Sequence, residues 1–113
     1  MSRAVLVVEG YADLRSAIVE TLSRGDFECD AAGGADAAIE KLREHRYEAI
    51  LLASRLPIRD DPVMRFLHAA QPDQLRKVIV MAEPEVDSAD DDPRILLKPF
   101  NVEQLLAKMN ARA

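Results

Sequence analysis

Two side chains of opposite charge stand directly after apolar runs, and their types make them the first candidates for chemistry. Glu9 follows the apolar run 4–8, and Lys98 follows the short run 95–97. If these runs are parallel strands, both side chains lie at the carboxyl ends of the strands, where open α/β sheets bind ligands. There they can form an ion pair, or Lys98 can hold a small anion. Ala53, after the third apolar run, offers no charge, proton or nucleophile at the same edge.

The other reactive side chains are explained by structure more simply than by catalysis. Asp60 and Asp61 precede a proline, the pattern of a helix that starts with an acidic cap and proline at its first position. His45 and His68 are isolated from other metal-ligating residues, and we interpret both as surface residues. Cys29 lies in a strand pattern and is expected to be a small core residue. No catalytic triad or carboxylate pair emerges, so the sequence does not predict an enzyme.

Five apolar runs and four helical patterns alternate along the chain and must position these residues. A run of four or five apolar residues is typical of a strand buried on both faces, and the i, i+3, i+4, i+7 spacing is typical of an amphipathic helix. Strand–helix alternation predicts a parallel sheet with right-handed crossovers. The predicted strands are 4–8, 27–31, 49–52, 78–81 and 95–97, and the predicted helices begin near residues 13, 34, 62 and 102.

The connection between the fourth and fifth strands differs from the others. Thirteen residues separate Met81 from Ile95, and six of the ten residues 83–92 are acidic. A full amphipathic helix is not expected there, so we predict that the fourth helix is shortened or lost. The segment is either a solvated acidic connector or the mark of an apolar surface that a partner covers.

Length and charge restrict the class of protein. The 113 residues are enough for one core, so residues 1–113 are predicted to form a single domain. The net charge of -5 argues against a nucleic-acid partner. No apolar run approaches the roughly 20 residues of a membrane helix, and no signal peptide is apparent, which predicts a cytoplasmic protein without membrane contact.

The order of these motifs resembles the receiver domain of two-component response regulators. The resemblance covers almost the whole chain, and it implies a flavodoxin-like, doubly wound, five-stranded parallel sheet in the order 2-1-3-4-5. The residues that carry it are Val7-Val8-Glu9, Leu14-Arg15, Leu51-Leu52-x-x-Arg55-Leu56-Pro57, Val78-Ile79-Val80-Met81 and Lys98-Pro99-Phe100.

Members of that family carry a phosphoryl group on an aspartate after the third strand, beside a divalent metal, and this sequence departs from that pattern. The matching acceptor position is Ala53, and the switch aromatic on the fifth strand is Ile95. The family's acidic pair after the first strand is reduced to one carboxylate, its Ser/Thr after the fourth strand is an alanine, and its Lys-Pro is retained. The degenerate phosphoacceptor pocket implied by the resemblance comprises Glu9, Gly10, Ala53, Ala82, Lys98 and Pro99.

These departures together remove a mechanism, because a carboxylate nucleophile and its metal ligands are lost at once. We therefore predict no aspartyl phosphate, no tight magnesium binding and no cofactor. The predicted function is a pseudo-receiver that acts through protein–protein contacts in signalling. Its partner is a signalling protein or a second copy of the chain, bound through strands four and five and the last helix, with an interaction face of Val102, Leu105, Leu106 and Met109.

Two alternatives stay open at the level of sequence. One is a phosphorylatable receiver that uses a non-standard acceptor, for which Glu9 is the best-placed carboxylate and Asp60 and Asp61 are displaced candidates. The other is a flavodoxin-like domain that binds a small ligand. The loop after the first strand, residues 9–13, contains no glycine-rich phosphate cradle, which disfavours the second alternative.

Overall fold

Strands and helices alternate along the chain in the computed structural model, which describes residues 3–54, 58–82, 95–98 and 100–112. Short 3-10 turns cover Ile58–Asp60 and Pro72–Lys77. The strands are β1 (Arg3–Val8), β2 (Phe27–Ala32), β3 (Ala49–Ser54), β4 (Val78–Ala82) and β5 (Ile95–Leu97). The α-helices are α1 (Ala12–Ser23), α2 (Ala35–Glu44), α3 (Pro62–Ala70) and α4 (Val102–Arg112).

The five strands form one parallel sheet in the order β2-β1-β3-β4-β5, which confirms the predicted topology. β3 lies at the centre, flanked by β1 and β4, and β2 and β5 form the edges. The register aligns Val5 with Ala49 and Ile50 with Val78, so the carboxyl ends of the central strands meet at one edge of the sheet. The prediction of a shortened fourth helix between β4 and β5 falls on residues 83–94, outside the described residues.

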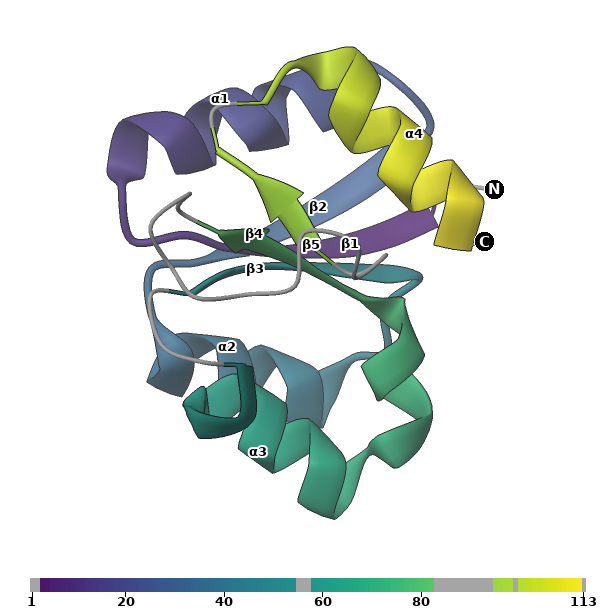
Figure 1. The fold of residues 1–113 in the computed structure, drawn as a ribbon. Helices are drawn as coiled ribbons and strands as arrows, with labels where there is room; N and C mark the ends of the chain where they lie inside the picture. The colour runs from purple at the N-terminus through teal and green to yellow at the C-terminus, as the bar shows by residue number, and fades with distance from the viewer. Residues whose placement is uncertain (1–2, 55–57, 83–94, 99, 113) are drawn as a thin grey trace.

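Helices cover both faces of the sheet, with α1 and α4 on one face and α2 and α3 on the other (Figure 1). Along β3 the side chains alternate between the two resulting cores. Ile50 and Leu52 join the core under α2 and α3, whereas Ala49 and Leu51 join the core under α1 and α4. This double burial explains why β3 is apolar at every position from 49 to 53.

Side chains cap the starts of both α3 and α4, and the acidic cap of α3 is the predicted one. Asp61 Oδ1 accepts hydrogen bonds from the backbone N–H groups of Val63 (2.8 Å) and Met64 (3.3 Å). Asn101 and Gln104 exchange two bonds of 2.8 Å between side chain and backbone N–H, which is a reciprocal capping box. Each cap satisfies backbone donors that the first helical turn leaves without a partner.

The isolated reactive side chains also lie where the sequence indicated. His45 and His68 are exposed. Cys29 is half-buried against the core under α1 and α4, and burial raises the pKa of its thiol. Tyr47 is buried, and its hydroxyl donates a hydrogen bond of 2.6 Å to Asp30 Oδ2.

Within the described ranges, the helices are too short or too polar to cross a membrane.

The predicted interaction face on α4 is wrong for two of its residues. Leu105 and Met109 are 2% and 5% exposed because they pack against the sheet in the same core as Ile18. Leu106 is partly buried against that core. The apolar stripe of α4 is therefore used by the chain's own fold, and the side chain of Val102 lies outside the described part of the structure.

Candidate functional site

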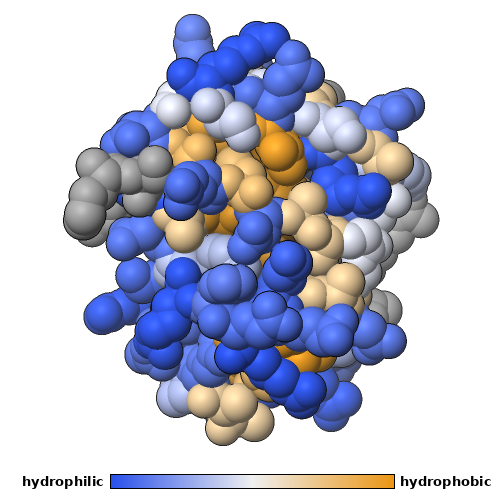
Figure 2. Space-filling view, turned by 180° about the vertical axis from the view of Figure 1, so that it is seen from behind, coloured by the Kyte–Doolittle hydropathy of each residue, from blue (hydrophilic) through white to orange (hydrophobic). Residues whose placement is uncertain are grey.

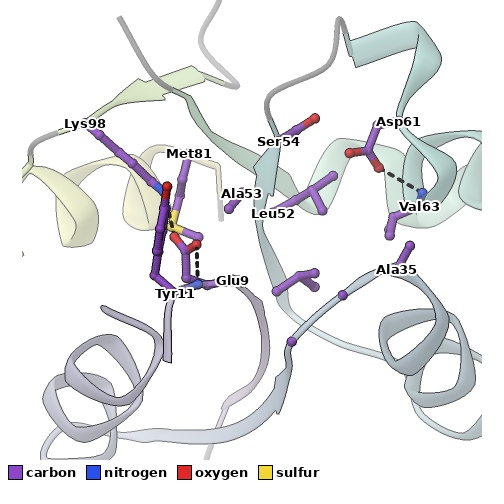
Figure 3. A pocket seen from close by; sticks show the side chains of 14 residues that line it. Glu9, Tyr11, Ala35, Leu52, Ala53, Ser54, Asp61, Val63, Met81 and Lys98 are labelled. Atoms are coloured by element: carbon purple, nitrogen blue, oxygen red, sulfur yellow. Dashed lines mark hydrogen bonds and ion pairs between the residues drawn. The ribbon is translucent and has the colours of Figure 1, made fainter. Parts of the chain in front are cut away.

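A pocket of about 440 Å³ opens at the carboxyl ends of the strands (Figure 3). The size is within the range of about 300–1,000 Å³ that is usual for small-molecule sites. The ends of β1, β3 and β4, the loop after β2 and the start of α3 contribute to it. The lining residues are Val8, Glu9, Gly10, Tyr11, Gly33, Gly34, Ala35, Leu52, Ala53, Ser54, Asp61, Val63, Met81 and Lys98.

A buried ion pair forms one wall of this pocket. Lys98 Nζ lies 2.6 Å from Glu9 Oε1, and the two side chains are 12% and 2% exposed. The expected proximity of Glu9 and Lys98 is thus confirmed, and the ammonium neutralises the carboxylate locally. Such close charge pairing compensates part of the cost of removing both groups from water.

The other two oxygens of Glu9 also accept hydrogen bonds within the protein. Oε2 accepts a hydrogen bond of 3.2 Å from the backbone N–H of Tyr11, and the backbone carbonyl accepts one of 2.8 Å from Arg15 Nη1. A Cβ on Gly33 would lie only 3.2 Å from the same Arg15 nitrogen, so the glycine leaves room for this guanidinium. Lys98 Nζ also lies 5.5 Å from the centre of the Tyr11 ring, within cation–π range.

Ala53 lies at the centre of the site. Figure 3 shows its methyl group between Met81 and Leu52. Ala53 pairs in register with Met81 on β4, and both residues line the pocket. These methyl, thioether and isobutyl groups supply no nucleophile and no hard oxygen ligand. Ser54, the last residue of β3, also lines the pocket and carries a hydroxyl group.

Asp61 lines the opposite wall, but its carboxylate caps α3. The bonds from its Oδ1 to two backbone N–H groups, and its 6% exposure, indicate a structural role at the helix N-terminus. Asp60 is exposed in the preceding 3-10 turn. Among the residues that the structure describes, no three His, Cys, Asp or Glu side chains gather into a group that could hold a metal ion.

Solved receiver domains share this architecture over nearly the whole chain. A response regulator receiver protein from Pseudomonas putida has a TM-score of 0.76 at 21% identity and covers 98% of both chains. Chemotaxis response regulator CheY4 of Vibrio cholerae has a TM-score of 0.74 at 21% identity and covers both chains completely. NtrX from Brucella abortus has a TM-score of 0.77 at 20% identity, and here the match spans 99% of this chain but 27% of NtrX. No protein-family model and no curated protein sequence matches the chain.

This chain has the receiver-domain fold. Within that fold, the structure brings four of the residues predicted for the degenerate pocket together, since Glu9, Gly10, Ala53 and Lys98 all line it. Pro99 is outside the described residues.

Two further predicted positions lie beside the pocket without lining it. Ala82 is buried at the end of β4, and its backbone carbonyl accepts a hydrogen bond of 2.8 Å from the N–H of Lys98. Ile95, which the resemblance places at the switch position, is 5% exposed in the core under α2 and α3. Neither side chain has a polar group to turn toward the pocket.

Sequence reasoning missed several lining residues of this receiver-like pocket. Tyr11 is 52% exposed at its edge, Met81 contributes from β4, and Gly33 and Gly34 contribute from the loop after β2. A usable signal existed for the two glycines. In this strand order β2 lies beside β1, so residues just after β2 must reach the same edge as Glu9.

Proposed function

We propose that this chain is a phosphorylation-independent interaction module of two-component signalling, built on the receiver fold, and that it is not an enzyme. A single observation carries the proposal. At the end of β3, the position of the family's acceptor holds the methyl group of Ala53, while the neighbouring Glu9 is already paired with Lys98 at 2.6 Å.

The chemistry of phosphoryl transfer to a carboxylate supports this proposal. An acyl phosphate needs a carboxylate that can attack phosphorus and a divalent ion that neutralises the transferring oxygens. Glu9 is the remaining candidate nucleophile at the ion-pair wall, but its Oε1 contacts Lys98 and its Oε2 accepts a hydrogen bond from a backbone N–H. Use of Glu9 as a non-standard acceptor would require both contacts to break, which disfavours that alternative.

The partner is a signalling protein or a second copy of the chain, and it would meet polar rather than apolar residues on α4. Glu103, Gln104 and Asn110 are exposed on this helix, whereas Leu105 and Met109 are buried. Polar surfaces of this kind are typical of transient contacts rather than of obligate dimers, whose interfaces are more apolar. We therefore expect an interaction that is weaker and more sensitive to salt than a stable homodimer.

Intact-protein mass spectrometry tests the proposal. The wild-type chain is incubated with magnesium and a small-molecule phosphodonor, beside a receiver domain that carries aspartate at the position of Ala53. The expected result is no change in mass for the wild-type chain and a gain of one phosphoryl group for the other protein. A stoichiometric gain on the wild-type chain, mapped to residues of the pocket, would overturn the proposal.

The variant Ala53→Asp provides a matched comparison in the same scaffold. It adds a carboxylate beside Glu9, so it supplies both a nucleophile and a second oxygen ligand for magnesium. We expect magnesium to raise the melting temperature of Ala53→Asp and to leave that of the wild-type chain unchanged, because only a ligand that binds the folded state shifts the melting temperature. Equal shifts in both proteins would mean that magnesium binds without position 53.

A further inference from the structure

The edge strand β5 is weakly held by its backbone. It has three residues, Ile95–Leu97, and pairs on one side only, with β4. One further backbone bond, from the N–H of Lys98 to the carbonyl of Ala82, extends this pairing. Short edge strands of this kind gain little from ladder hydrogen bonds alone, so other contacts must determine how firmly β5 is held.

The ion pair provides a second attachment for β5, and it reaches past two strands. β1 and β5 are separated by β3 and β4, so their backbones are about 14 Å apart at the usual spacing of about 4.8 Å per strand. In Figure 3 the side chain of Lys98 runs beside Met81 toward Glu9. The methyl of Ala53, which lines the same pocket, offers no oxygen that would compete with Glu9 for the ammonium.

We propose that the Glu9–Lys98 pair is a latch that fixes β5 against β1 and keeps divalent cations from Glu9, so that the β5–α4 side of the domain stays in one conformation. The latch rests on the proposed function, because it explains how an interaction surface is kept constant without phosphorylation. The cation that pairs with Glu9 is the ammonium of Lys98, so it comes from the chain itself. A divalent ion could use Glu9 only by displacing an ammonium 2.6 Å away from a carboxylate that is 2% exposed.

Burial makes the latch selective against magnesium. Magnesium keeps several of its waters and is usually bound through one or two carboxylates at an open site. Here both Glu9 oxygens have partners inside the protein, at 2.6 Å and 3.2 Å. Arg15 Nη1 also donates a hydrogen bond of 2.8 Å to the backbone carbonyl of Glu9, which fixes the backbone that carries the carboxylate.

Amide hydrogen exchange measured by NMR tests the latch in the full chain. In Lys98→Met we expect the amides of β5 to exchange at least about tenfold faster than in the wild type, relative to the change at the central strands β1 and β3. Lys98→Arg is the conservative variant and should keep β5 protected, because a guanidinium can still reach Glu9. In the wild type, magnesium should leave the β5 exchange rates unchanged.

Three results would overturn the latch. The first is unchanged β5 exchange in a folded Lys98→Met protein. The second is an acceleration at β5 that does not exceed the acceleration which the loss of global stability produces at β1 and β3. The third is a magnesium-dependent change of β5 exchange in the wild type. If Lys98→Met does not fold, Glu9→Gln gives the same comparison with less buried charge. Phosphorylation of the wild-type pocket would refute the proposed function by mass alone, whereas unchanged β5 exchange in the variants would refute the latch alone.

Discussion

Removing the ammonium of Lys98 is expected to destabilise the protein more than removing the charge of Glu9. In Lys98→Met, the Glu9 carboxylate stays at 2% exposure without a counter-ion, and breaking a buried pair in this way costs about 3–5 kcal/mol of unfolding free energy. In Glu9→Gln, the end of Lys98, which is 12% exposed, can turn toward water. We expect this second change to cost about 1–2 kcal/mol, between the value of a neutral hydrogen bond and that of one to a charged group.

These free energies correspond to readily measured melting shifts. An unfolding entropy of about 2.1 cal/mol/K per residue gives about 0.24 kcal/mol/K for 113 residues. Lys98→Met should therefore lower the melting temperature by about 12–21 °C, and Glu9→Gln by about 4–8 °C. The double variant should lose about 1–2 kcal/mol, because neither charge is left alone, and the coupling energy of the cycle should be about 3–5 kcal/mol.

Urea unfolding followed by far-ultraviolet circular dichroism measures all four corners of this cycle. An exposed ion pair provides the matched control, since Arg24 and Glu20 are also 2.6 Å apart but have side chains that are 75% and 68% exposed. Solvent screens that pair, so Arg24→Met should cost less than about 0.5 kcal/mol. The contrast between two pairs of equal length isolates the effect of burial.

Additive losses would refute the reasoning on the buried pair. If the double variant loses the sum of the two single losses, the charges are not coupled. If Lys98→Met costs no more than Glu9→Gln, the carboxylate finds water or another partner, and the burial of Glu9 does not govern the stability of the site.

Three further predictions follow from particular contacts. Asp61→Ala should lower the unfolding free energy by about 1–2 kcal/mol, more than Asn101→Ala, because the cap on α3 is buried and the cap on α4 is exposed; equal losses in urea would contradict this. Burial, followed by the hydrogen bond to a carboxylate, raises the pKa of Tyr47, so the unfolded chain loses this proton first and stability falls as pH rises above about 10. Tyr11→Phe leaves Tyr47 as the one tyrosine, so in a pH titration of this variant tyrosinate absorbance should rise together with the loss of circular dichroism. Ionisation of Tyr47 in a still-folded protein would contradict this prediction. Leu105→Ala should lower the unfolding free energy, measured in urea, by about 2–5 kcal/mol, because this side chain belongs to the core. A loss under about 1 kcal/mol would instead support the predicted interaction face on α4.

Local patterns in the sequence determined the elements and their class. The apolar run of β3 and the helical spacing of α2 depend on neighbours within a few residues, so they can be read without knowing the fold. Alternating strands and helices then require a parallel sheet, and the resemblance to receiver domains supplied its order. The substitution at Ala53 was equally visible, because it concerns the identity of one residue at the end of a strand.

Only the tertiary structure decided how the remaining groups are used. Glu9 and Lys98 are 89 residues apart, and their contact depends on a path across two intervening strands that no local pattern describes. The same limit explains the error on α4. Periodicity identifies Leu105 and Met109 as an apolar stripe, but a stripe can face a partner or the chain's own sheet. The packing of α4 against that sheet buried it, because covering an apolar stripe within the chain requires no second molecule.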